Sequence, residues 1–136
     1  MDGEPIWLAL GDVLEIQAEQ IALFGGPSGI RSIALIESAL MRPRNMFHYE
    51  GVDDLLELAV RLGVGLAVNH GFVDGNKRTG AVALIEFLAI NGYFLAMPND
   101  TTFGVLFEAA VAGRMSEEEL AQDLFAYVEP LFDEDR

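Results

Sequence analysis

Residues 70–79 read HGFVDGNKRT and stand between two segments with helical patterns. The preceding residues predict a helix over 54–69, and the following ones predict a helix that begins near Asn76 and ends at about residue 91. From 81 to 90 the only polar residue is Glu86, which predicts that the second of these helices is central and buried. The quoted stretch is therefore expected to form the junction of a helix–loop–helix unit.

The rest of the chain predicts four further helices and two short extended segments. The helices are expected at 12–24, 32–41, 101–112 and 116–129, with Pro43 ending the second of them and residues 45–52 forming a loop. Residues 93–97 are expected to form a strand that pairs with residues 7–10. The predicted fold class is all-α, a compact six-helix bundle with at most a small two-strand pairing, in a single domain over residues 1–136.

Two of these helices carry local signals at their first residues. Asp12 and Ser32 have short polar side chains that suit helix N-caps. In the first helix, Leu14, Ala18 and Ile21 are spaced to share one face, which we expect to be the buried one.

Composition narrows the classes of function. The chain has 136 residues, is 51% hydrophobic and contains no cysteine and two histidines, which excludes disulfides, thiolate zinc sites and histidine-rich metal sites. The net charge of −14 argues against a nucleic-acid partner, because such proteins usually present a basic surface. Neither a signal peptide nor a membrane-spanning segment is evident, so we expect a cytoplasmic protein without membrane contact.

The junction combines the groups that hold a polyphosphate. A helix N-terminus offers unpaired N–H groups to an anion, and Gly75 lets the backbone approach it closely. Lys77, the only lysine of the chain, and Arg78 lie in the first helical turn, where the helix dipole disfavours cations unless an anion is bound. Asp74 is placed to hold a magnesium ion that accompanies the phosphates, and His70 can act as a general base toward a hydroxyl.

Each of these residues also has an ordinary structural interpretation. A histidine at a helix end often caps the helix, an Asp-Gly-Asn sequence often forms a turn, and a Lys-Arg pair often lies on a solvated face. Phe72, between the polar residues, is interpreted as a core anchor for the loop. The chemical interpretation is favoured because all of these groups fall within nine residues at one junction.

The junction resembles the signature of the Fic/Doc superfamily: histidine, any residue, Phe, any residue, Asp or Glu, Gly or Ala, Asn, Gly or Lys, and Arg. The fixed positions are met by His70, Phe72, Asp74, Gly75, Asn76, Lys77 and Arg78. The resemblance to Doc toxins extends to residues 29–31, 37–43 and 91–93 and to Asn69, and it implies a Fic/Doc-like helical domain.

The resemblance implies roles for these residues. His70 would deprotonate the target hydroxyl, Asp74 would bind Mg²⁺, and residues 75–78 would hold the phosphates of ATP, with Asn76 helping to position them. Doc toxins are similar to kinases and phosphorylate a threonine of elongation factor Tu, which arrests translation. They are neutralised by a Phd-type antitoxin whose C-terminal segment lies in a groove of the toxin, which we expect on the apolar surface of the first two helices.

Differences from the family pattern leave two other functions open. Lys77 in place of glycine, and Ala81 in place of a second arginine, favour the phosphate-transferring Doc branch over Fic-type transfer of AMP or another nucleotide. Gly71 and Gly80 replace the usual proline and alanine, and they are expected to loosen the loop and weaken the helix. They also leave open a catalytically decayed module that only binds an antitoxin or a nucleotide.

Two further expectations concern packing and inhibition. The glycines at 63 and 65, inside the helix before the junction, are expected to allow close helix packing. The family's inhibitory motif, Ser or Thr followed four residues later by Glu and then Gly or Asn, is not met, because Met46 stands where Glu50-Gly51 would require Ser or Thr. This predicts an inhibitor supplied by a separate protein.

Overall fold

The structure is a computed structural model that describes residues 3–132. It confirms the all-α class: within these residues there are six helices and one antiparallel pair of short strands. The elements, in chain order, are α1 (Leu10–Phe24), α2 (Ile33–Glu50), α3 (Leu55–Asn69), α4 (Asn76–Ile90), β1 (Tyr93–Leu95), α5 (Thr102–Val111), α6 (Glu117–Phe125) and β2 (Val128–Pro130). Among the described helices, none is both long and apolar enough to cross a membrane.

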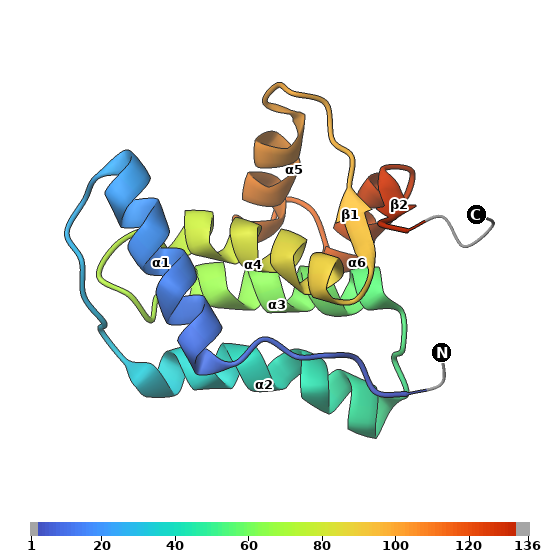
Figure 1. The fold of residues 1–136 in the computed structure, drawn as a ribbon, viewed down its shortest axis with the longest axis horizontal. Helices are drawn as coiled ribbons and strands as arrows, with labels where there is room; N and C mark the ends of the chain where they lie inside the picture. The colour runs from blue at the N-terminus through green and yellow to red at the C-terminus, as the bar shows by residue number, and fades with distance from the viewer. Residues whose placement is uncertain (1–2, 133–136) are drawn as a thin grey trace.

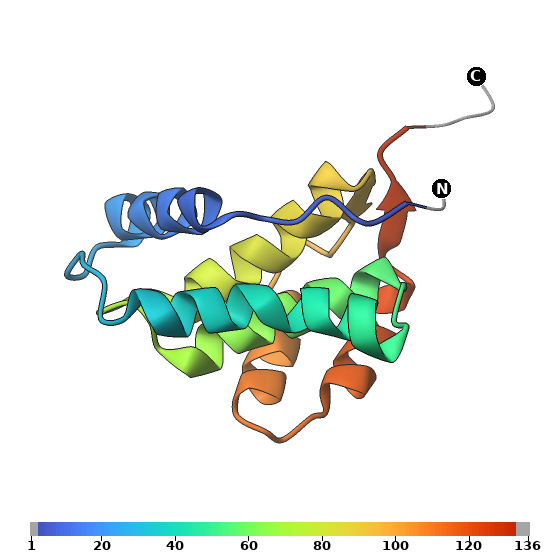
Figure 2. The ribbon, with the colours of Figure 1, turned by 90° about the horizontal axis from the view of Figure 1, so that it is seen from below.

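The pair α3 and α4 forms the centre of the bundle. Figure 1 shows α2 running beside α3 on the side away from α4. Figure 2 shows α1 on one side of the central pair and α5 and α6 on the other. The helices that carry the predicted junction are therefore enclosed on several sides, and their relative position is fixed by packing.

The two central helices approach each other closely at two glycines. A Cβ atom added at Gly80 would overlap the carbonyl oxygen of Gly63, and one added at Gly63 would lie 2.7 Å from the carbonyl oxygen of Gly80. Gly65 faces Ala39 of α2 at ordinary contact distance. The prediction of close helix packing is confirmed for Gly63, and Gly80 has the same use, which accounts for a residue of low helix propensity in α4.

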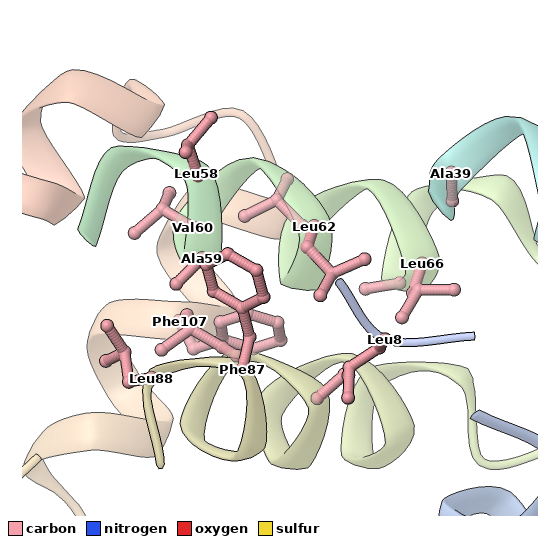
Figure 3. Close-up of a cluster of buried hydrophobic side chains, with 14 of the residues drawn as sticks. Leu8, Ala39, Leu58, Ala59, Val60, Leu62, Leu66, Phe87, Leu88 and Phe107 are labelled. Atoms are coloured by element: carbon pink, nitrogen blue, oxygen red, sulfur yellow. The ribbon is translucent and has the colours of Figure 1, made fainter. Parts of the chain in front are cut away.

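The core lies mainly between α3 and α4. In Figure 3, Phe87 lies in the space between the two helices, and Phe107 joins it from α5, whereas Leu58 projects from the side of α3 that faces away from α4. Phe87 is fully buried, and Trp7 stacks on it with ring centroids 5.7 Å apart. Burial of large side chains of this kind supplies most of the favourable free energy of folding.

The predicted end of the second helix was wrong. The structure continues α2 through Pro43 to Glu50, so residues 45–50 are helical and not a loop. Pro43 is buried, and packing of α2 on α3 outweighs the loss of one backbone hydrogen bond at the proline. The helix ends at Gly51, which adopts the left-handed conformation with φ 71°. The N-cap was predicted correctly: the Ser32 hydroxyl accepts a hydrogen bond from the Leu35 N–H at 3.2 Å.

The strand pairing was predicted in part. The strand near residue 93 is confirmed as β1, but its antiparallel partner is β2, with Phe94 opposite Glu129. Residues 7–9 form no strand, and α6 ends at Phe125, before β2. The segment before α1 is held by side chains instead, because the Asn91 amide hydrogen-bonds the N–H and carbonyl of Ile6 at 2.8 and 2.9 Å.

The first helix also differs from its prediction. It begins at Leu10, so Asp12 lies in the first turn, where its carboxylate accepts a hydrogen bond from the Ala9 N–H at 2.8 Å. The predicted face is buried only in part: Leu14 and Ile21 are half-buried, and Leu14 packs against the core, but Ala18 is exposed. The residues on the buried face are Val13, Ile16, Gln17 and Gln20.

The glycine contact predicts the effect of a single added methyl group. Gly80→Ala should lower the free energy of unfolding by about 1–3 kcal/mol, because the new Cβ must push α3 away from α4. Gly104→Ala is the matched control, since a Cβ there meets nothing within 4 Å, and it should raise stability by about 0.4–1 kcal/mol. Urea denaturation measures both, and equal effects of the two substitutions would contradict the role of Gly80.

Candidate active site

The predicted junction lies beside the loop that joins α1 and α2 (Figure 1). Backbone hydrogen bonds connect the two loops: the Gly71 carbonyl accepts from the N–H groups of Arg31 and Ser32 at 2.7 and 2.9 Å, and the Val73 N–H donates to the Gly29 carbonyl at 3.0 Å. The junction is therefore part of a two-loop unit.

His70 ends α3 in an unusual backbone conformation. Its φ is 52°, and it is the only non-glycine residue with a positive φ among residues 3–132. This conformation costs a non-glycine residue about 1–2 kcal/mol. The preceding residue is anchored, since the Asn69 amide donates to the Leu35 carbonyl of α2 at 2.9 Å. His70 itself is exposed, so its imidazole is open to an incoming substrate.

Gly71 packs tightly, contrary to the expectation that it loosens the loop. The residue is buried, and a Cβ added there would overlap the side chain of Ile36 on α2. Its carbonyl already accepts the two hydrogen bonds described above. The glycine thus lets the chain turn against α2 immediately after His70.

The side chain of Asn76 closes the loop on itself. Its Oδ1 accepts from the Phe72 N–H, and its Nδ2 donates to the Phe72 carbonyl, both at 3.0 Å. Phe72 is 2% exposed and belongs to the core, so its interpretation as an anchor is confirmed. Asn76 therefore supports the loop conformation with its side chain and leaves its backbone N–H at the start of α4.

Asp74 is held by two hydrogen bonds, and a glycine leaves space for its carboxylate. Its Oδ1 accepts from the Gly75 N–H at 2.8 Å, and its carbonyl accepts from the Gln17 amide of α1 at 3.2 Å. Gly26 makes room for the carboxylate, because a Cβ there would overlap Oδ2. A carboxylate kept in place in this way is the kind of ligand that Mg²⁺ takes alongside phosphate oxygens, so Asp74 could hold the ion. No group of three or more metal-binding side chains occurs among the described residues.

Gln17 and Gly26 were missed by the sequence reasoning. Gln17 is 5% exposed on the packed face of α1, and a buried amide of this kind requires a hydrogen-bond partner. The available signal was its spacing of four residues from Val13, which places both on one helical face. Gly26 was visible only as part of a glycine-rich break.

The start of α4 has no side-chain cap, as an anion site at a helix N-terminus requires. Gly75 is the N-cap, with φ 79°, and no side chain caps the helix there. The first N–H groups of α4 therefore have no intrahelical partner. They form the positive end of the helix, which directly follows the loop that contains Asp74.

The side chains of Lys77 and Arg78, both in the first turn of α4, contact different elements. The Lys77 ammonium donates to Glu108 of α5 at 2.8 Å, and the hydrogen bond and charge of Lys77 hold the pKa of the Glu108 carboxyl below its usual value. The Arg78 guanidinium turns toward the end of α1, where it donates to the Gly25 carbonyl at 3.4 Å and lies 5.4 Å from the centre of the Phe24 ring. In the protein alone, both side chains have internal acceptors.

Cavities elsewhere suit an anionic ligand poorly. One of about 410 Å³ lies at the opposite end of α3, and its lining includes Asp54, Glu57 and Glu118. A neighbouring one of about 330 Å³ shares the two glutamates. Since these carboxylates would repel phosphate, the junction is the better candidate for a nucleotide.

Comparison with known proteins agrees with the position of the junction. A model described as the Fic/DOC family matches residues 7–88, which include α1 to α3, all but the last two residues of α4, and the whole junction. The chain is also 40% identical over 78 residues to a protein named Toxin Doc from Mycolicibacterium smegmatis. That alignment covers 57% of this chain and 60% of the relative, so the chain spans about three fifths of the curated protein that it matches. Since the family match covers more than half of its residues, the chain belongs to the Fic/DOC family.

Proposed function

We propose that this protein is a Doc-type toxin of a toxin–antitoxin pair that transfers the γ-phosphoryl group of ATP to a hydroxyl of a target protein. The observation that carries the proposal is the junction itself, where an exposed histidine, a held carboxylate and an uncapped helix N-terminus occur within one loop. By resemblance the target is a threonine of elongation factor Tu, and its phosphorylation would arrest translation in the cytoplasm.

The residues of the junction have different roles in the proposed phosphoryl transfer. His70 takes the proton of the target hydroxyl as its oxygen bonds to the γ-phosphorus, and the bond to the β–γ bridging oxygen breaks to release ADP. Asp74 would hold Mg²⁺, which neutralises phosphate charge. The N–H groups of α4, together with Lys77 and Arg78, bind the phosphates, and Asn76 maintains the loop that presents them.

Nucleotidyl transfer is the second candidate function, because the Lys77 side chain makes its contact with α5. Lys77 stands where AMP-transferring relatives have glycine, and a lysine side chain directed at the phosphates would crowd them. The side chain is instead directed to Glu108 on α5. The same residues can then place the α-phosphorus near His70, with release of diphosphate.

A decayed binding module is less well supported. Gly71 and Gly80 suggested decay, but both lie where a Cβ would overlap a neighbouring helix. Each glycine therefore has a packing reason, and the groups proposed for chemistry are all retained in the sequence.

The proposed inhibitor is a Phd-type antitoxin whose amphipathic segment covers apolar residues near the junction. Several large apolar side chains are exposed at the end of α1 and the start of α2: Leu23, Phe24, Ile30 and Ile33. A helix laid on such a surface is a common mode of recognition, and here it would lie beside the phosphate-binding loop.

Labelled ATP distinguishes the two reactions. With elongation factor Tu and Mg²⁺, label from the γ-phosphate should reach the target protein and label from the α-phosphate should not. His70→Ala should slow the transfer by about 10²–10⁴-fold, because it removes the general base and leaves phosphate binding intact. Transfer of α-label would establish nucleotidyl transfer, and transfer at the wild-type rate by His70→Ala would refute the assignment of the base.

Removal of one carboxylate charge tests the metal assignment. Asp74→Asn retains an oxygen that can accept from the Gly75 N–H, so the fold should persist while the Mg²⁺ concentration required for transfer rises by about tenfold or more. Asp123→Asn, at an exposed position of α6, is the matched control and should behave as wild type. A magnesium titration of the transfer rate measures both, and an unchanged requirement in Asp74→Asn would show that the metal is held elsewhere.

A further inference from the structure

We propose that Glu108 is a positioning residue for the phosphate site: it holds the Lys77 ammonium against α5 in the free protein and yields it to phosphate when a nucleotide binds. This inference rests on the proposed function, since it assumes that the anion at the start of α4 is the polyphosphate of ATP. It assigns a role to α5, which lies outside the residues matched by the family model.

The contact has the features of an exchangeable ion pair. The Lys77 Nζ and the Glu108 Oε1 lie 2.8 Å apart, and the two side chains are 54% and 48% exposed. Because water reaches both groups, separating them does not leave a buried charge without a partner. A polyphosphate carries more negative charge than one carboxylate, so it competes effectively for the ammonium.

The helix dipole makes this contact favourable in the free protein. Lys77 lies in the first turn of α4, a turn that contains no acidic residue and is the positive end of the helix. Glu108 supplies the missing negative charge from a neighbouring helix. The hydrogen bond and charge of Lys77, followed by the charge of Arg114, lower the pKa of the Glu108 carboxyl.

The composition of the chain allows a direct experiment. Lys77 is the only lysine, so a protein grown with ¹³C-labelled lysine gives one side-chain ε-CH₂ signal in an NMR spectrum. Saturating Mg–ATP, without target protein, should shift this signal. Glu108→Gln should shift it in the free protein, because the ion pair is lost, whereas Glu86→Gln, an equal change of charge at an exposed position of α4, should not.

The affinity for Mg–ATP provides the second measurement. Loss of the competing carboxylate should lower the dissociation constant by about two- to fivefold in Glu108→Gln, the range expected for an exposed ion pair. This decrease in the dissociation constant should be absent when Glu108→Gln is combined with Lys77→Met. An equal decrease in that combination would overturn the proposal, because it would reflect only the loss of a negative charge near the site.

The outcomes also separate this proposal from the proposed reaction. If Mg–ATP shifts the Lys77 signal and Glu108→Gln tightens Mg–ATP binding only when Lys77 is present, but no γ-label reaches elongation factor Tu, the role of Glu108 stands and the proposed phosphotransfer to this target is refuted. If label is transferred but saturating Mg–ATP leaves the Lys77 signal unmoved, the role of Glu108 is refuted. Absence of any Mg–ATP binding, in wild type and in Glu108→Gln alike, would overturn both.

Discussion

The approach of α3 to α4 at Gly63 and Gly80 is the constraint on which the rest of the structure depends. Each glycine lies where a Cβ would press on a backbone carbonyl of the other helix, so the two axes come closer than side chains normally allow. His70 ends one of these helices, and the turn proposed to bind phosphate begins the other. The distance between the proposed base and this turn is therefore set largely by a contact made of backbone atoms.

The loop between the two helices is held by contacts from three sources. Gly71 packs on α2, Gln17 of α1 binds the Asp74 carbonyl, and Asn76 closes the loop from within. A loop fixed in this way loses little conformational entropy when a ligand binds. This arrangement agrees with a reaction in which the protein contributes mainly position and charge.

The features that were predicted correctly depend on neighbours along the chain. The bounds of α3 and α4 followed from apolar periodicity, and the role of Ser32 followed from its capping chemistry. The core position of Phe72, and the placement of the motif residues at one junction, came from a motif that is local by definition.

The features that were missed depend on residues distant in sequence. Pro43 usually ends a helix, yet packing of α2 on α3 carries the helix past it. In the sequence, Gln17 has the character of a surface residue. Only the tertiary structure brings the Asp74 carbonyl to its amide as a hydrogen-bond acceptor. The partner of Lys77 lies 31 residues away on α5, and local pattern does not predict such a contact. The chemical groups of the candidate site could thus be predicted from the sequence, whereas their orientation is determined by the tertiary structure.

The solitary lysine has a practical consequence for handling the protein. Reagents that acylate side-chain amines, including those used to attach proteins to sensor surfaces or to fluorescent dyes, find only one such target, and it stands at the start of α4. Coupling there would remove a positive charge and place a bulky group at the turn proposed to bind phosphate. Immobilisation chemistry that spreads over many side chains in most proteins would therefore modify a single side chain in this one, at the proposed site.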